Sequence, residues 1–86
     1  MASHIARLGD ASDHGGVIIS AASRTFINGK AAARKGDLHS CPRHGVTAIV
    51  SGSDTIIIEG QPAARVGDKT ACGAVITSGS LDTSAG

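Results

Sequence analysis

The chain has 86 residues, which is enough for one small domain. With a single Phe and no Trp or Tyr, its core must be built from Ile, Val, Leu and Ala, so burial alone stabilises it only weakly. A formal net charge of +1, the absence of a basic run and the lack of stacking aromatics argue against nucleic acid as a partner. No apolar run approaches the roughly 20 residues of a membrane-spanning helix, and no signal peptide is recognisable.

A five-residue phrase that ends in Gly-Asp occurs three times along the chain. It reads ARLGD at 6–10, ARKGD at 33–37 and ARVGD at 64–68. The aspartates are 27 (10 to 37) and 31 (37 to 68) residues apart. One structural unit is therefore used three times.

The segments between these phrases predict short strands and tight turns. Each Gly-Asp is followed by a polar loop and then by an apolar run, at 17–19, 47–50 and 74–77. Twelve glycines and many Ser and Thr residues interrupt the apolar runs, which excludes long amphipathic helices and indicates an all-β fold.

The first two units continue into β-hairpins, and the third hairpin is split between the chain ends. The hairpin signals are Asn28-Gly29 and the turn at 59–60, where both residues of the turn need a positive φ. Residues 81–86 stand where the third outgoing strand belongs, and residues 3–6 where its returning strand belongs. We therefore expect the termini to pair, with Gly86 near Met1, and to close a pseudo-threefold ring without exposed strand edges.

Each loop after a Gly-Asp carries side chains that bind soft or borderline metal ions. These are His14 in the first loop, His39, Cys41 and His44 in the second, and Cys72 in the third. The repeat places all three loops at one end of the molecule, and short His/Cys spacings suit tetrahedral Zn²⁺. Two thiols are too few for an iron–sulfur cluster. The alternative is that the cysteines are buried small side chains or a disulfide and that the histidines are solvated.

Five donors compete for the four places of a closed site, so one cysteine is either a spectator or packs behind the site. A closed four-ligand zinc is structural, because a catalytic zinc keeps an open position. Such an ion couples about 10 kcal/mol or more of binding free energy to folding. His4 lies away from these loops, and we expect it to be an ordinary exposed or partner-facing residue.

The repeated Gly-Asp predicts a structural turn and no catalysis. Glycine permits a positive φ, and the adjacent Asp10, Asp37 or Asp68 can bond the loop backbone or meet an Arg. The chain offers no nucleophile with a placed base and no phosphate-binding glycine loop, so we expect no enzyme. A small zinc hydrolase would require that only three donors bind the metal.

The third unit contains Pro62-Ala63-Ala64-Arg65, followed by Gly67-Asp68 and by Thr70-Ala71-Cys72-Gly73. These residues resemble the PAAR-repeat family. The first unit, with His14-Gly15-Gly16, and the second, with His39, Cys41-Pro42 and His44-Gly45, are similar to the other family segments, so the resemblance covers essentially the whole chain. Only the third unit has the literal tetrapeptide; residues 4–7 and 31–34 are its equivalents.

The resemblance implies a single domain over 1–86, shaped as a small cone or prism of short strands with one structural zinc near the vertex. Relatives hold that zinc through three histidines and one cysteine, which in this chain implies His14, His39, His44 and Cys72. We prefer Cys72 to Cys41 because a site on the axis should recruit all three loops. The rival set replaces Cys72, or one histidine, with Cys41.

The resemblance also implies the tip of a type VI secretion spike. One monomer would cap a trimeric VgrG-type protein, sharpen it for puncturing a target membrane, and travel with effectors or adaptors, without nucleic acid or a small-molecule substrate. Assembly would take place in the reducing bacterial cytoplasm and export through the type VI machinery. Because the chain ends once the ring can close, we expect a bare tip without an effector extension. The alternative is a zinc-stabilised β-rich module for another partner or, less favoured, a small zinc hydrolase.

Overall fold

The computed structural model describes residues 3–42, 45–80 and 83–85, and these residues form short β-strands joined by turns and loops, without a helix. The predicted all-β class is confirmed. None of the described segments forms a helix that could cross a membrane. The strands in chain order are β1 Ser3–His4, β2 Val17–Ile18, β3 Phe26–Ile27, β4 Lys30–Ala31, β5 Leu38–Cys41, β6 Gly45–Ala48, β7 Ile57–Ile58, β8 Gln61–Pro62 and β9 Ser84–Ala85.

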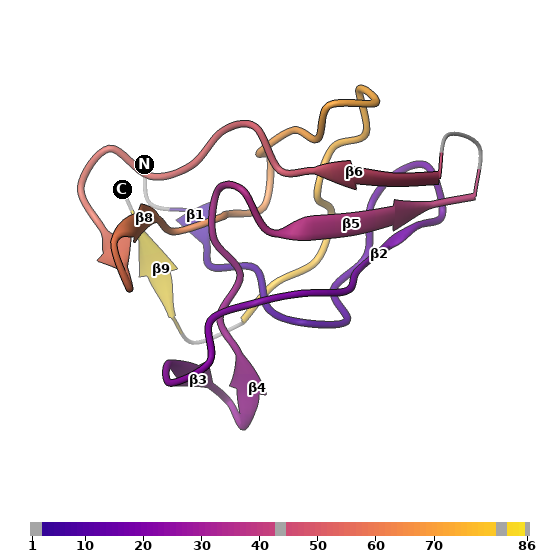
Figure 1. The fold of residues 1–86 in the computed structure, drawn as a ribbon. Coiled ribbons are helices and arrows are strands. Elements are labelled where there is room, and N and C mark those ends of the chain that lie inside the picture. The colour runs from indigo at the N-terminus through magenta and orange to yellow at the C-terminus, as the bar shows by residue number, and fades with distance from the viewer. Residues whose placement is uncertain (1–2, 43–44, 81–82, 86) are drawn as a thin grey trace.

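The sheets are small, and all of their strand pairs are antiparallel. The largest has the order β2-β5-β6, with Val17 opposite Ser40 and with Ser40 opposite Val46. The pairs β3-β4, β7-β8 and β1-β9 are separate two-stranded ribbons. In Figure 1 the β5-β6 hairpin reaches to one side of the molecule, away from these three ribbons.

The third ribbon joins the two ends of the chain, as the split hairpin predicts. Ser3 is paired with Ala85 and His4 with Ser84, so β1 and β9 lie side by side in Figure 1. The narrower expectation, that Gly86 lies near Met1, concerns residues outside the described part of the chain.

The two complete hairpins turn through pairs of residues with positive φ. Asn28 and Gly29 have φ of 56° and 79°, and Glu59 and Gly60 have φ of 49° and 85°. A two-residue turn of this kind matches the right-handed twist of the strands that it joins. Both predicted turns are confirmed.

Three backbone hydrogen bonds between equivalent alanines define the pseudo-threefold axis. Ala6 N–H donates to Ala64 O (2.9 Å), Ala64 N–H to Ala33 O (3.0 Å) and Ala33 N–H to Ala6 O (3.0 Å). This cycle visits each unit once. All three alanines are fully buried, and larger side chains would separate the backbones that meet here.

The core consists of two layers stacked along that axis. One contains the three axial alanines and one isoleucine from each unit, Ile18, Ile49 and Ile76. The other lies toward the hairpins and contains Ile5, Ala22, Ile27, Ala32, Ile58 and Ala63. Each layer buries little apolar area for its number of residues, so burial alone stabilises the fold weakly.

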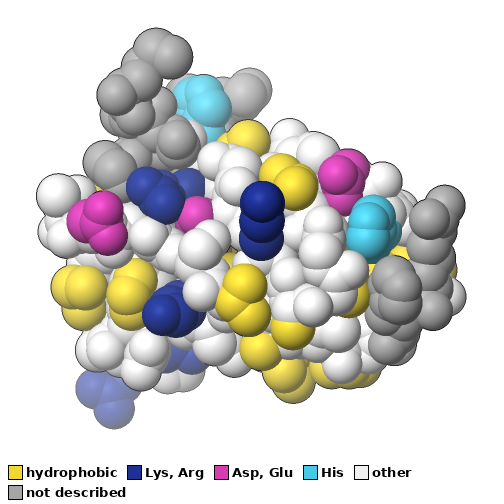
Figure 2. Space-filling model, turned by 90° about the horizontal axis from the view of Figure 1, so that it is seen from above, with side chains coloured by type: hydrophobic (Ala, Val, Ile, Leu, Met, Phe, Trp, Pro, Cys, Tyr) yellow, Lys and Arg dark blue, Asp and Glu magenta, His cyan; other side chains and the backbone are white. Residues whose placement is uncertain are grey.

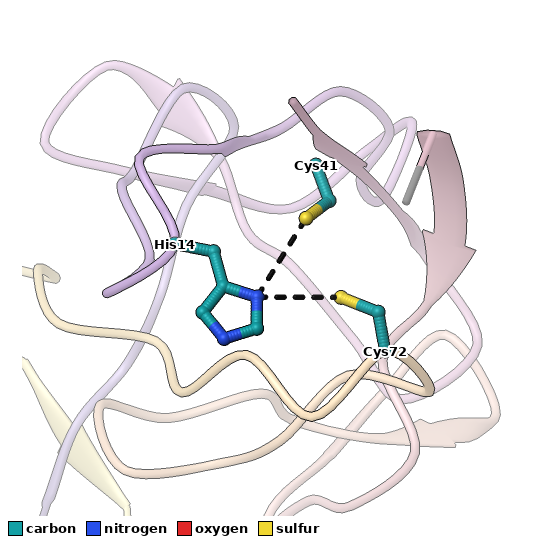
Figure 3. A group of neighbouring side chains, drawn as sticks. All are labelled: His14, Cys41 and Cys72. Carbon is teal, nitrogen blue, oxygen red and sulfur yellow. Dashed lines mark hydrogen bonds between the residues drawn. The ribbon is translucent and has the colours of Figure 1, made fainter. Parts of the chain in front are cut away.

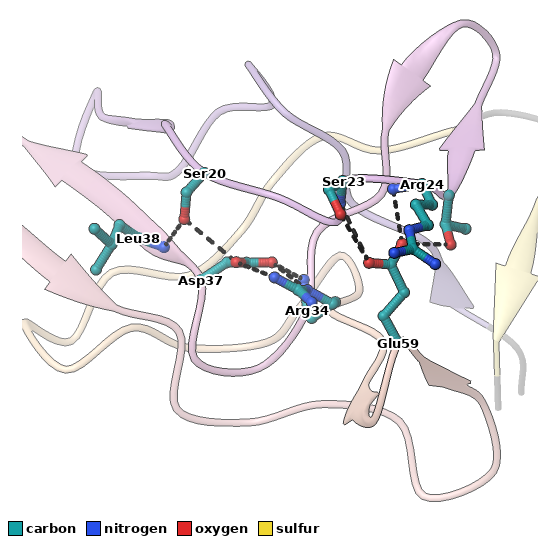
Figure 4. A network of polar contacts seen from close by, with 8 residues as sticks. Ser20, Ser23, Arg24, Arg34, Asp37, Leu38 and Glu59 are labelled. Carbon is teal, nitrogen blue, oxygen red and sulfur yellow. Dashed lines mark hydrogen bonds and ion pairs between the residues drawn. The ribbon is translucent and has the colours of Figure 1, made fainter.

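A repeated polar network ties neighbouring units together. Asp37 accepts hydrogen bonds from Arg34 N–H (2.8 Å), Nε (3.0 Å) and Nη2 (3.0 Å), and from Ser20 Oγ (3.3 Å) of the preceding unit (Figure 4). Ser20 Oγ in turn accepts Leu38 N–H (2.8 Å). Equivalent networks surround Asp10, with Arg7 and Ser78, and Asp68, with Arg65 and Ser51. The predicted structural role of the aspartates is confirmed.

Candidate metal centre

The three loops that follow Gly-Asp meet at one end of the molecule. The first and third are joined by Asp13 N–H to Val75 O and by Thr77 N–H to Ala11 O, both 2.9 Å. The third and second are joined by Ala71 N–H to Ala48 O (2.9 Å), while the β2-β5 pairing joins the second to the first. The loops thus form a closed ring of backbone hydrogen bonds.

His14, Cys41 and Cys72 point toward one another inside this ring (Figure 3). His14 Nδ1 lies 3.6 Å from Cys41 Sγ and 3.9 Å from Cys72 Sγ, and the three ligand atoms all lie within 4.8 Å of one another. Both cysteines are free thiols. Zinc bonds of about 2.0 to 2.3 Å hold their donors roughly 3.5 Å apart, so modest side-chain adjustment would suit a tetrahedral ion.

The three donors occupy equivalent positions of the repeat. Each is the fourth residue after the aspartate of its unit (10 to 14, 37 to 41 and 68 to 72). The second unit has four extra residues, because Cys41 precedes its core isoleucine by eight positions (41 to 49) whereas His14 and Cys72 precede theirs by four. The extra residues come after Cys41 in the sequence, so the three donors keep the same spacing from their aspartates. The cluster therefore surrounds the pseudo-threefold axis.

The surroundings of Cys72 favour its thiolate form. Hydrogen bonds, first from the Thr70 hydroxyl (3.1 Å) and then from Ala74 N–H and the Thr47 hydroxyl (3.7 Å), outweigh desolvation and lower the pKa of Cys72 to about 5. A thiolate is the form of cysteine that binds metal ions. At neutral pH Cys72 can therefore bind a metal ion without first having to lose a proton.

His39 lies on β5, two residues before Cys41, and its side chain is fully buried. Its Nε2 is 2.8 Å from Ser12 Oγ, which also accepts Gly16 N–H (3.2 Å). Gly16 has to be glycine, since a Cβ there would lie 2.6 Å from His39 Nε2. The other ring nitrogen, Nδ1, is buried and finds no hydrogen-bond partner among the described residues.

Two of the four predicted ligands, His14 and Cys72, lie together in the cluster. Cys41, which the prediction kept as a rival donor, completes the trio. His39 is not a member of the trio, and His44 lies outside the described residues. Counting from the repeated aspartates would have identified the trio, because only these three donors share one position of the repeat. His4 is exposed on β1, as expected.

Comparison with known families gives one result that covers most of the chain. The family profile of the PAAR motif matches residues 8–78. No curated protein matches the sequence. The matched range covers most of the chain and includes His14, Cys41 and Cys72, so the chain belongs to the PAAR motif family.

Proposed function

We propose that this protein is the tip of a type VI secretion spike, where one monomer caps a VgrG-type trimer. The observation that carries the proposal is the closed ring of Ala6, Ala33 and Ala64, which gives a single chain the symmetry of a trimer end. A monomer with internal threefold symmetry can present similar surfaces to three identical subunits. Membership of the PAAR family supports the same role.

The hairpin end of the molecule offers the contact surface for such a trimer. Phe26 and Ile57 are the first residues of β3 and β7, and their side chains are 62% and 59% exposed. Their neighbours Ile27 and Ile58 belong to the core layer on this side. Exposed apolar side chains beside short strand edges favour docking that combines apolar contact with backbone pairing.

The opposite end is the proposed vertex, drawn together by one structural zinc. His14, Cys41 and Cys72 would hold it together with a fourth donor from the predicted set, and the ion would link three loops that come from three repeats. A zinc ion that cross-links the loops would stabilise the fold of a small domain whose apolar core contributes little stability. During contraction the vertex would concentrate force on the target membrane and lead effectors or adaptors out of the producing cell.

The face in Figure 2 is consistent with a protein-docking module. Lys, Arg, Asp and Glu side chains are scattered over it in ones and twos, and apolar side chains gather along one edge. A mixed surface of this kind gives no strong electrostatic field for a charged polymer.

The test is a native mass spectrum of the zinc-loaded chain mixed with a spike trimer encoded beside it. We expect a complex of one chain, three spike subunits and one zinc. Ile57→Asp should abolish the complex without loss of zinc, because it places a charge in the contact surface. Val46→Asp is the matched control, since Val46 is 58% exposed but lies on β6, in the hairpin of the vertex.

Failure of the unmodified chain to bind any such trimer, with zinc still present, would contradict the proposal. The protein would then be a metal-stabilised β-rich module for a different partner. Loss of binding by Val46→Asp but not by Ile57→Asp would show that the trimer contacts the vertex, and would contradict docking at the hairpin end.

A further inference from the structure

Cys41 and Cys72 are two free thiols that lie close together although they come from different repeats. They are 31 residues apart in the sequence (41 to 72), and the ligand atoms of their cluster, which include both sulfur atoms, all lie within 4.8 Å of one another. Figure 3 shows the two side chains pointing into the same space. The chain has two cysteines, so this is the one pair that can be linked within a molecule.

The backbones that carry the two thiols are held near each other by β6. Cys41 lies on β5, which pairs with β6 over its whole length. Ala71 N–H donates to Ala48 O (2.9 Å) at the end of β6, and the Thr47 hydroxyl lies 3.7 Å from Cys72 Sγ. A disulfide requires closely spaced backbones and an S–S bond of about 2.05 Å. Because β6 supplies the close backbones, side-chain rotation is the main movement that a disulfide would need.

The two thiols differ in their access to solvent. Cys41 is 2% exposed, whereas Cys72 is half-buried. The Thr70 hydroxyl, 3.1 Å from Cys72 Sγ, can donate a hydrogen bond to this sulfur and so stabilise its anion. Thiol–disulfide exchange begins when an accessible thiolate attacks an oxidant, and a neighbouring thiol then resolves the mixed disulfide. The exposure of the two sulfurs suits Cys72 for the attack and Cys41 for the resolving step.

We propose that the metal-free vertex is a disulfide site, at which a small-molecule disulfide such as oxidised glutathione links Cys41 to Cys72. Cys72 gives its proton to solvent and attacks one sulfur of the oxidant, whose S–S bond breaks and releases a thiolate that takes up a proton. Cys41 then attacks Cys72 Sγ and displaces the second thiolate. The proton of Cys41 passes to His14 Nδ1, 3.6 Å from Cys41 Sγ, and from there to that thiolate. Two thiols of the chain are oxidised, and the oxidant is reduced to two thiols.

The disulfide would fasten two of the loops that the proposed zinc would fasten. A thiolate is the form of cysteine that binds metal ions, so a metal ion and the disulfide exclude each other at these sulfurs. The vertex would be held by an ion in reducing surroundings and by a covalent bond in oxidising ones. The inference uses the placement of the two sulfurs and not the spike, so a chain that caps no trimer could still form this bond.

The first test uses the unmodified full-length chain, freed of metal by a chelator and equilibrated in a glutathione redox buffer. We expect the intact mass to fall by two hydrogen atoms, with no glutathione attached, and peptide mapping to find Cys41 joined to Cys72. The buffer composition at half-oxidation gives the effective concentration of the two thiols. It should be roughly 100-fold higher without denaturant than in urea. Equal values would show that the fold does not bring the thiols together, and would overturn the proposal.

The order of the two steps can be tested with a matched pair of variants. Cys41→Ser lacks the resolving thiol, so it should stop at a mixed disulfide with one glutathione on Cys72. Cys72→Ser makes the same substitution at the other sulfur and should react at least about tenfold more slowly, because Cys41 is buried. In the unmodified reduced chain, limiting iodoacetamide should alkylate Cys72 before Cys41. The reverse order in either experiment would contradict the assigned roles.

The disulfide should also be visible in thermal denaturation of the metal-free chain. The bond closes a loop of about 30 residues and restricts the unfolded chain, so we expect the oxidised form to have a Tm roughly 15 °C above that of the reduced form. Dithiothreitol should remove this difference. A Tm of the oxidised form equal to or below that of the reduced form would show that the bond strains the vertex, and the proposal would be wrong.

Discussion

Asp37 shows at the scale of one residue how the repeated phrase works. Its buried carboxylate binds the backbone and the guanidinium of Arg34, and the hydrogen bond from Arg34 to Asp37 raises the pKa of that guanidinium. The Ser20 hydroxyl adds a link to the preceding unit. The phrase therefore acts as a joint between repeats as well as a turn.

Asp37→Asn should destabilise the fold. The amide carries one NH₂ group toward donors that need an acceptor, so at least one charge-assisted hydrogen bond is lost, at a cost of about 2 kcal/mol. For a domain of this size we expect the Tm in thermal denaturation to fall by roughly 10 °C. Asp54→Asn, an exposed acidic residue, is the control and should change it little. Equal Tm values for the two variants would show that the joint does not contribute to stability.

Glu59 is another residue whose carboxylate joins two units. It accepts Arg24 N–H (2.9 Å), the Thr25 hydroxyl (2.9 Å), and the N–H and hydroxyl of Ser23 (both 3.3 Å), as Figure 4 shows in part. These bonds, first of all the one from Arg24 N–H, lower the pKa of Glu59 from its ordinary value of 4.5. The charged form is therefore favoured in the folded protein.

The stability that Glu59 contributes should depend on pH. Because its folded pKa is depressed, the contribution is complete above the ordinary value of 4.5 and disappears as the pH falls through the folded pKa. We expect Glu59→Gln to have a lower Tm than the parent at pH 7 and the gap to narrow below pH 4.5. Thermal denaturation of both proteins between pH 7 and pH 3 measures this difference in Tm. A gap that widens in acid would contradict this assignment.

At the scale of elements, the three hairpins begin in similar ways but are capped differently. Ser53 Oγ accepts the N–H groups of Thr55 (3.1 Å) and Ile56 (3.0 Å), and Ser80 Oγ accepts Thr83 N–H (3.1 Å). The equivalent residue of the first unit is Ala22, which has no hydroxyl. Glu59 reaches across from the second hairpin and accepts Ser23 N–H and Arg24 N–H, of which Arg24 N–H is the equivalent of the Thr55 N–H that Ser53 caps.

Ala22→Ser should therefore rescue Glu59→Gln. The backbone fits, since Ala22 N–H, Ser53 N–H and Ser80 N–H each donate to the equivalent carbonyl, at 2.8 to 2.9 Å. In the Glu59→Gln background the new hydroxyl should restore about 1 kcal/mol, whereas in the parent it should change stability little. Urea denaturation of the parent, the two single variants and the double variant gives the coupling free energy between the two substitutions. Equal effects in both backgrounds would show that the two caps are independent.

Much of the element level could be predicted from the sequence. Repeats, turn residues and the split hairpin are local signals, and all of them appear in the structure. The depth of the metal donors could not be predicted in the same way. As a single polar loop in the sequence, the segment 39–44 gives no reason to distinguish its two histidines from Cys41. The strand β5 separates them, since it places His39 and Cys41 in successive layers on one side.

The donor set was also hard to predict because the residue type of a metal ligand does not determine its position in the fold. The family resemblance implies three histidines and one cysteine, and this rule leaves Cys41 as a rival donor. The cluster in the structure follows the register of the repeat instead, with one residue at the same position in each unit. Register can be counted in the sequence once the repeats are aligned on their aspartates, but the contacts of His39 with Ser12 and Gly16 require the folded structure.

At the scale of the whole molecule, the thin apolar core would make a metal ion bound by His14, Cys41 and Cys72 a major source of stability. An ion present at 1,000 times its Kd adds about 4 kcal/mol, and in a domain of this size each kcal/mol corresponds to roughly 4 to 8 °C in Tm. We therefore expect the Tm in calorimetry to fall by roughly 20 °C when a chelator removes the metal. Cys72→Ser should start from a lower Tm and respond little to the chelator. A parent protein that keeps its Tm without metal would show that the polar joints and the two apolar layers suffice.

Because β1 pairs with β9, the protein is a candidate for circular permutation. The third ribbon is a hairpin without its turn, whereas β3-β4 and β7-β8 are the same element with a two-residue turn present. A short turn from β9 to β1 would complete the ring, and the chain could then be opened at 28–29 or at 59–60. Each circular permutant would keep the pseudo-threefold axis, the aspartate networks and the vertex. A domain fused to its new termini would, however, project from a different one of the three hairpins.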